Sequence, residues 1–466
     1  MLLQLILFTF ALWLGLYLLT RRTEKTALRL AGFGLAAYAL ALASDLLNQG
    51  APNPTLAENI ARLHWLSVFW PALFWSGALA YSLPEEAPLR ARLTALWRWG
   101  LTPAAALFSL LAFGTPLVVT FTAARPQPGL LYWLWAVLVI LPLIASAFLL
   151  SRTLAPPRAA RPWALLLISA LFFALSTGLM LFPLELLPRA WMLFLLGLDL
   201  GFLGVTIIAL DAFDEGEAWQ ADLLRSLAAS ELMAAVFGGL VALAALLGAG
   251  WTFPMVALLI ATLAVAIAVP VFADRLQAAL DRLVFARLPR LRQARAELRE
   301  ISEALPRMDS ALDPLALDEA EFVRLTRRAI SHLGNLPRLA ASPLTQLPII
   351  QGRLTQRGAN GNALERAAEL KALLIETIRQ LKPGGRGDFG ASDEWRHYNA
   401  LYFPYVAGLK PYSRRADGDG LDPTARAALD WFQAAVPERT LHNWQNAAAR
   451  LVALNLLERH KSPNWQ

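Results

Sequence analysis

The first 272 residues of the chain consist mainly of long apolar stretches separated by short polar ones. The hydrocarbon core of a membrane is roughly 30 Å thick, and a helix needs about 20 apolar residues to cross it. Stretches of that length recur at 2–20, 27–48, 61–83, 97–121, 129–151, 163–183, 190–210, 226–249 and 251–272. The pattern therefore predicts a bundle of about nine membrane-crossing helices.

The pattern changes after residue 272, where apolar residues recur at helical spacing among polar ones. Segments of this kind lie at 318–333, 363–381, 392–409, 422–435 and 438–458, with proline and glycine clusters between them. We find no strand alternation of useful length. The prediction is an all-α fold, a polytopic transmembrane helix bundle at 1–272 followed by a cytoplasmic all-helical domain. That domain divides into a connecting helix at 273–305, a helical region at 306–391 and a helix-turn-helix-like domain at 392–466.

The connecting helix is expected to be amphipathic. Its first apolar face holds Leu276, Leu280, Leu283, Val284, Leu288 and Leu291, and the series Leu291, Ala294, Leu298, Ile301 and Leu305 then steps by three and four. Such steps are typical of a coiled-coil seam. Two interpretations stay open: a homodimer formed through 291–305, or a surface helix that lies on its own domain or on lipid headgroups.

Composition supports a chain that meets two solvents. The mean hydropathy is +0.46 and 57% of the residues are hydrophobic. Of the net charge of +7, the residues after 272 carry +6, which could attract lipid headgroups or nucleic acid. The chain has no cysteine, and its five histidines show no metal-ligand spacing. We expect no metal, no cofactor and no enzymatic activity, since no nucleophile or acid/base pair is evident.

The distribution of cations predicts the orientation in the membrane. If the N-terminus lies outside, the inner loops hold eleven basic residues and the outer loops three. The inner ones are Arg21, Arg22, Lys25, Arg29, Arg90, Arg92, Arg98, Arg152, Arg158, Arg161 and Arg225, and the outer ones are Arg62, Arg125 and Arg189. Cytoplasmic loops carry the excess of basic residues. We therefore predict a multi-pass protein of the bacterial inner (plasma) membrane with a cytoplasmic C-terminus.

Two stretches of the chain resemble parts of membrane histidine kinases. Residues 56–83 (LAENIARLHWLSVFWPALFWSGALAYSL) resemble part of the seven-helix N-terminal sensor region, and residues 271–305 resemble the helix that joins this sensor to its kinase core. The resemblance implies a sensor. We expect no kinase core, because the 134 residues that follow His332 hold no nucleotide-binding boxes.

His332 resembles a phosphoacceptor histidine in one respect. Ser331 precedes it and Pro337 follows five residues later, but the acidic residue expected directly after the histidine is missing. The alternative, which we favour, is a histidine near the end of helix 318–333 with Gly334 as its C-cap.

The last two helices resemble the helix-turn-helix of sigma-factor region 4 over residues 395–458. Asp422 and Pro423 predict a helix start, and Val436 and Pro437 predict a tight turn. The second helix has a polar stripe opposite its apolar one, made of Arg439, His442, Asn443, Asn446 and Arg450. Arginine and asparagine can read base edges. The insertion at 410–421 and Trp444 depart from the pattern, so DNA and a cytoplasmic protein both remain as partners. Asn455 interrupts the apolar stripe, where we expect the helix to leave its core.

Ionisable residues inside a membrane are candidates for sensing, because a charge there costs several kcal/mol unless it is paired or hydrated. Asp199 lies near the middle of the seventh crossing. Asp45, Arg62 and His64 lie near the outer ends of two others, where they could line one outward-facing pocket roofed by tryptophans. The alternative for Asp199 is a purely structural role, in which it accepts a hydrogen bond from a neighbour such as Ser176.

Two classes of function follow. The first is a receptor, in which a membrane sensor for an unknown ligand signals through 273–305 to a cytoplasmic helical output that binds protein or DNA. The second is a transporter or membrane scaffold with an accessory domain. We favour the receptor, because no inverted repeat typical of transporters is detectable.

Overall fold

The computed structural model describes residues 1–21, 25–83, 88–122, 125–152, 160–181, 189–215, 220–285, 314–359, 361–384, 387–412 and 421–461. These residues are almost entirely helical, so the predicted all-α class is confirmed. The chain divides into two compact units. The bundle unit comprises Met1–Asp211 and Leu223–Leu280, and the C-terminal unit comprises Ala212–Asp222 and Asp281–Gln466.

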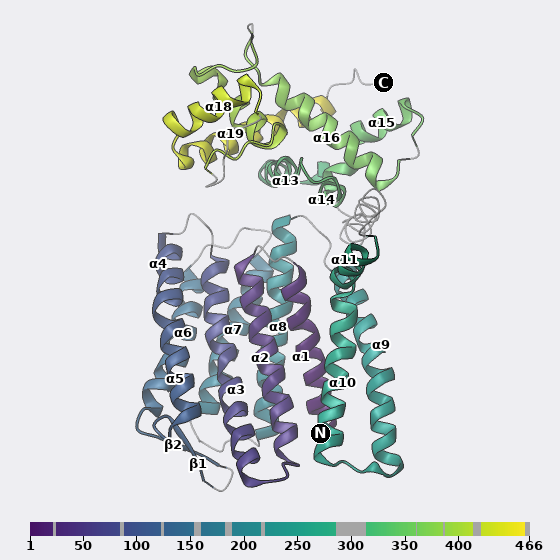
Figure 1. Ribbon diagram of the computed structural model, residues 1–466. Coiled ribbons are helices and arrows are strands. Elements are labelled where there is room, and N and C mark those ends of the chain that lie inside the picture. The colour runs from purple at the N-terminus through teal and green to yellow at the C-terminus, as the bar shows by residue number, and fades with distance from the viewer. Residues whose placement is uncertain are drawn as a thin grey trace. The chain divides into compact units, whose positions relative to one another are not determined.

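The bundle unit is a set of long helices that run side by side (Figure 1). In chain order they are α1 (Leu2–Arg21), α2 (Thr26–Asn48), α3 (Pro54–Ser82), α4 (Pro88–Leu96), a π-helical turn (Trp97–Leu101), α5 (Thr102–Gly114), α6 (Tyr132–Arg152), α7 (Ala160–Leu181), α8 (Arg189–Glu215), α9 (Gln220–Ala244), a second π-helical turn (Ala245–Ala249) and α10 (Phe253–Val271). A short antiparallel hairpin, β1 (Val119–Thr122) and β2 (Arg125–Pro128), joins α5 to α6. The apolar pattern did not predict this hairpin. Its first strand lies within the crossing expected at 97–121, so the helix there ends earlier than predicted.

Seven helices in the described part are long and apolar enough to cross a membrane. They correspond to α1, α2, the continuous helix formed by α4 and α5, and α7 to α10. The two other expected crossings coincide with α3 and α6. Tryptophan and Pro71 lower the mean hydropathy of α3, and the apolar part described for α6 is Tyr132–Ser146. Nine crossings therefore stay a prediction.

The outer surface of the bundle unit is apolar. Large side chains on its peripheral helices are more than half exposed, among them Leu110, Leu141, Phe172, Phe202, Leu240 and Val265. Soluble monomers rarely expose apolar patches larger than a few hundred Å². A continuous apolar exterior of this kind fits a membrane protein, whose outer face is solvated by lipid.

Glycines bring the central helices of the bundle close together. A Cβ at Gly32 of α2 would lie 2.8 Å from the carbonyl oxygen of Gly15 on α1, which is too close for any side chain. On α8, Gly197 faces Tyr38 and Gly204 faces Leu14 in the same way. Helices in lipid associate through such small-residue contacts because no hydrophobic effect drives them together there.

The C-terminal unit contains short helices packed around α16 and α19. Its elements are η5 (Pro314–Ala316), α13 (Glu319–Ser331), α14 (Leu336–Ala340), η6 (Pro343–Gln346), α15 (Pro348–Gln356), α16 (Ala363–Gln380), η7 (Asp393–Trp395), α17 (Arg396–Leu401), the π-helical turn η8 (Tyr402–Val406), α18 (Pro423–Ala435) and α19 (Glu438–Lys461). Helix α11 (Ala273–Val284) begins in the bundle unit and ends in this one.

Four of the five predicted helices after residue 306 form as expected. The side chains of Asp318 and Asp422 accept backbone N–H bonds at the starts of α13 and α18, as N-caps do. The expected helix at 392–409 is instead three short elements, η7, α17 and η8. The prediction of Gly334 as a C-cap was wrong, because His332 occupies that position and Gly334 has no positive φ.

Helix α19 belongs to two hydrophobic cores. The first core is built on α13, α14, α15, α16 and the C-terminal half of α19, and the second on α17, η8, α18 and the N-terminal half of α19. Leu456 is buried and Leu457 packs against the first core. Helix α19 therefore does not leave its core at Asn455, contrary to the sequence-based expectation. The regions expected on either side of residue 392 share this helix.

Candidate functional site

Asp45 and His64, two of the three residues predicted to line an outer pocket, contact different neighbours. The amide Nε2 of Gln4 on α1 donates to Oδ2 of Asp45 at 2.7 Å. His64 is buried, and its Nδ1 lies 2.7 Å from the carbonyl oxygen of Ala41 on α2. With that nitrogen protonated, His64 caps a backbone acceptor inside the bundle.

Arg62, the third residue, points toward the end of α5. Its guanidinium pairs with Glu58 at 2.6 Å and donates to the carbonyl oxygen of Phe113 at 2.8 Å. Free carbonyls at a helix C-terminus carry partial negative charge, which a cation stabilises. The structure therefore does not bring Asp45, Arg62 and His64 together through any of these bonds.

Asp199 contacts the neighbour that the sequence suggested. The Ser176 hydroxyl on α7 donates to Oδ2 of Asp199 on α8 at 2.7 Å. This bond joins the last third of α7 to the middle part of α8. Trp65, the residue after His64 in the sequence, packs against Phe69 and Trp135 within the bundle.

Sequence reasoning missed a second carboxyl group inside the bundle. Glu231 lies midway along α9, half-buried, and its side chain hydrogen-bonds with Thr9 of α1. Nearby, Nε1 of Trp13 donates to the hydroxyl of Ser226 at 3.1 Å. These contacts form a polar seam between α1 and α9. Glu231 could have been found from the sequence, because it falls inside the apolar stretch 226–249.

The most buried ion pair described in the bundle joins α1, α2 and α8. Oδ2 of Asp211 lies 3.3 Å from Nε of Arg21, and Oδ1 lies 2.5 Å from Nζ of Lys25 at the start of α2. The Arg21 side chain is 0% exposed and that of Asp211 3%. Arg21 also donates to the Tyr17 hydroxyl at 2.8 Å. We name this cluster the Asp211 clasp.

The polar stripe predicted on α19 is at the surface. Arg439, His442, Asn443, Asn446 and Arg450 are all exposed. Arg450 pairs with Glu319 of α13 at 2.7 Å, which ties one end of the stripe to the same unit. Trp444, which departed from the sigma-factor pattern, stacks on Trp431 of α18 with ring centroids 6.0 Å apart. It therefore acts as a packing residue between the two helices.

A charged network lies where α15, α16 and α19 meet. The carboxylate of Glu376 accepts from Arg353 at 2.8 Å and from Arg459 at 3.0 Å. Burial alone would raise the pKa of Glu376, but the hydrogen bonds and charges of the two arginines outweigh it and hold the pKa below its ordinary value. Glu369, which is buried, pairs with Arg353 and Arg357.

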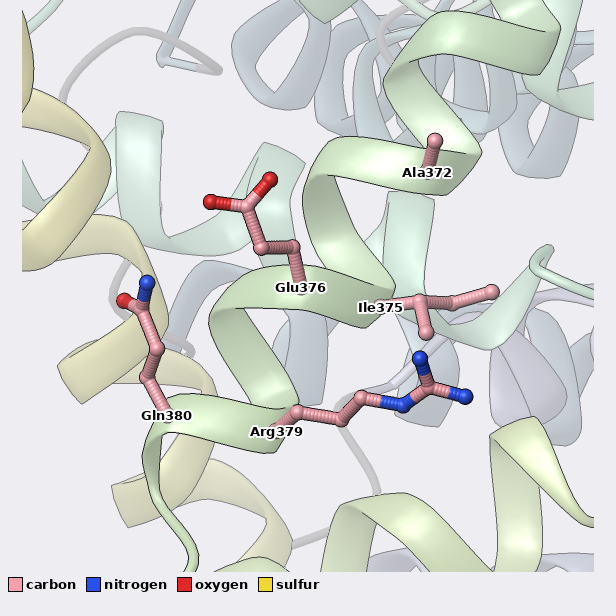
Figure 2. Close-up of a pocket in the computed structure, with 5 residues that line it drawn as sticks. All are labelled: Ala372, Ile375, Glu376, Arg379 and Gln380. Carbon is pink, nitrogen blue, oxygen red and sulfur yellow. The ribbon is translucent and has the colours of Figure 1, made fainter.

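A shallow hollow runs along the surface of α16 beside this network. Figure 2 shows Ile375 and Arg379 on one side of the helix and Glu376 and Gln380 on the other, with Ala372 one turn earlier. All of these residues come from one helix. A hollow lined in this way lacks the converging polar groups of a ligand pocket.

His332 lies in the turn after α13, beside Arg328 and Arg338 at a very small cavity. It is partly exposed and forms the C-cap of the helix, so the favoured interpretation holds for its position at the helix end but not for a cap at Gly334. The homodimer predicted through 291–305 falls outside the described residues. Among the described residues, no group of three or more His, Asp or Glu side chains could hold a metal ion.

Comparison with known proteins adds no relative to this picture: no family model, no curated protein and no solved structure matches the chain.

Proposed function

We propose that this chain is an integral membrane receptor, in which the bundle unit senses a ligand and the C-terminal unit is the output. The proposal includes a cytoplasmic C-terminal unit and nine crossings, with α3 and α6 among them. No catalytic group is required in such a protein, since binding to one unit only has to change the other.

The observation that carries the proposal is the way the chain passes between the units. Helices α8, α9 and α11 each begin in one unit and end in the other, at Asp211, Asp222 and Leu280. The chain is helical at each of these three boundaries. The Asp211 clasp lies at the first of these boundaries, so a movement of α1 or α2 against α8 would change its ion-pair distances.

The proposed orientation rests on the positions of the basic residues. The Asp211 clasp places Arg21 and Lys25 at one end of the bundle, which is the end predicted to be cytoplasmic. Trp133 and Trp191 are exposed at the starts of α6 and α8, at the other end. Tryptophan is enriched at both membrane interfaces, so these two residues support an interface at that end without distinguishing inside from outside. A reporter that fluoresces only in the cytoplasm, fused after Gln466, would stay dark if this orientation is wrong.

Removing the charge of Asp199 tests the coupling. Asp199→Asn keeps the shape of the side chain and an acceptor for Ser176, so we expect the bundle to stay folded in detergent. If Asp199 takes part in signalling, hydrogen exchange in α13 and α19 of the full chain should change. Mass spectrometry of the reconstituted protein measures this.

The matched control is Leu198→Ala, at a neighbouring position that is 40% exposed on α8. It should leave exchange in the C-terminal unit as in the wild type. Unchanged exchange in Asp199→Asn as well would count against the receptor and favour a transporter or scaffold with an accessory domain.

The output surface is the polar stripe of α19, and we propose a cytoplasmic protein as its partner. Two observations favour protein over DNA: Arg450 is engaged by Glu319, and Glu438 and Asp430 lie exposed near Arg439 in sequence. A DNA-binding face needs several cations that reach phosphates.

We therefore expect the full chain in lipid nanodiscs to show no binding to duplex DNA even at low salt. Electrophoretic mobility or fluorescence anisotropy measures this. DNA would be the partner instead if binding appears, falls steeply with salt, and weakens by about 1–3 kcal/mol in Arg439→Ala. Asp430→Asn, which removes an acidic neighbour, should then strengthen the binding and serves as the control.

A further inference from the structure

Helix α11 starts where the last bundle helix ends. Helix α10 carries Pro270 in its final turn, and Phe272 is the single residue that separates the two helices. Proline removes a backbone hydrogen bond and bends the helix, so the chain can change direction here. Helix α11 is therefore anchored at its start to the end of a helix that is apolar enough to cross the membrane.

The apolar face of α11 is exposed. Leu276 and Leu280 are 49% and 50% exposed, and Leu283 is 77% exposed. Steps of four and three residues place these leucines on one side of the helix. Val284, at 69% exposed, extends the same face. In water, burying apolar surface is favoured by roughly 25 cal/mol per Å², so this face requires an apolar partner.

Two arginines, seven residues apart, lie together on one side of α11, each about 100° around the helix from the leucine next to it in sequence. The guanidinium of Arg275 lies over the ring of Phe272, 5.8 Å from its centroid, and Arg282 is exposed. In the sequence, Arg287, Arg290 and Arg292 follow within ten residues of Arg282. An amphipathic helix with arginines beside its apolar face has the chemistry of a helix that lies in a membrane interface.

We propose that α11 binds the surface of an anionic bilayer, with its leucine face in the acyl boundary and its arginines among the headgroups. The occupant is lipid because α11 continues directly from α10, which keeps it within one residue of the bilayer. The arginines match acidic headgroups, which attract juxtamembrane basic segments. The proposal does not depend on the partner of α19.

Spin labels on the full chain test the proposal. The chain has no cysteine, so Leu280→Cys gives a single labelling site. In vesicles of phosphatidylcholine with phosphatidylglycerol, we expect this label to collide with oxygen rather than with a water-soluble nickel complex. The matched control is Ala278→Cys, about 200° around the helix from Leu276, where the label should not be in lipid.

A separate variant tests the contact between the arginines and the lipid headgroups. Arg275→Gln with Arg282→Gln should lower the ratio of inserted to solvated Leu280→Cys label roughly tenfold in the anionic vesicles. In pure phosphatidylcholine the variant and its parent should behave alike. Circular dichroism of both verifies that the helix content is unchanged.

Three results would overturn the proposal. The first is a Leu280→Cys label that is as accessible to nickel as the Ala278→Cys label. The second is spin–spin broadening that disappears on dilution with unlabelled protein, which would identify a second copy as the occupant. The third is an insertion ratio that does not depend on anionic lipid, which would show that the arginines do not bind anionic headgroups.

Discussion

Replacing Asp211 with alanine is expected to destabilise the bundle unit by about 3–5 kcal/mol, because it leaves the buried Arg21 guanidinium without its carboxylate. When one partner of a buried pair is removed, the desolvation energy of the remaining charge is no longer compensated. The loss of the Lys25 contact adds little, since that side chain is 32% exposed. Unfolding of the purified protein by dodecyl sulfate, followed by circular dichroism, measures the change.

A double replacement separates charge from packing. Arg21→Met with Asp211→Leu removes both charges and keeps most of the volume, so it should recover most of the lost stability. Arg21→Met alone should be nearly as harmful as Asp211→Ala. Equal losses in the single and double variants would mean that the clasp acts through shape rather than through charge.

Phe432→Ala should destabilise the whole C-terminal unit, including helices that Phe432 does not touch. Phe432 is 0% exposed in the second core, and deleting a buried phenyl group costs about 3–5 kcal/mol. Because α19 belongs to both cores, its loosening reaches the first core. Hydrogen exchange in α13 should therefore quicken by roughly a hundredfold or more, as in α18.

The comparison variant for this experiment is Phe432→Leu, which keeps most of the apolar volume. It should cost less than about 1.5 kcal/mol and change exchange only slightly. If Phe432→Ala quickened exchange in α17 to α19 while α13 and α16 kept theirs, the two cores would be independent and the predicted division at residue 392 would describe the folding units.

Local signals were predictable from the sequence. The caps Asp318 and Asp422 and the apolar spacing behind them located α13 and α18 within a residue or two. The helices at 336–356 were missed for an equally local reason. No helix was predicted in this proline-containing stretch, whereas Pro337, Pro343 and Pro348 each lie in the first turn of a short helix, where the missing N–H costs nothing.

Long-range contacts could not be predicted. Asp211 and Arg21 are 190 residues apart, and no periodicity relates them. Arg62 was placed with Asp45 and His64 because all three lie near helix ends, but its long side chain reaches the carbonyls of α5 instead. The Ser176 contact of Asp199 was foreseen because it needed only two adjacent helices with polar residues at matching depth.

The glycine contacts of the bundle imply an unusual pattern of tolerance to substitution. In a soluble domain, large buried residues are the ones that resist replacement. In a membrane the outer leucines and phenylalanines would face lipid, where one apolar residue serves as well as another. A Cβ at Gly32 would lie 2.8 Å from a backbone oxygen, one at Gly15 would lie 3.0 Å from another, and one at Gly197 would displace the Tyr38 hydroxyl. The smallest side chains should therefore be the most constrained ones, and a random library selected for folded protein should retain them while the outer face varies.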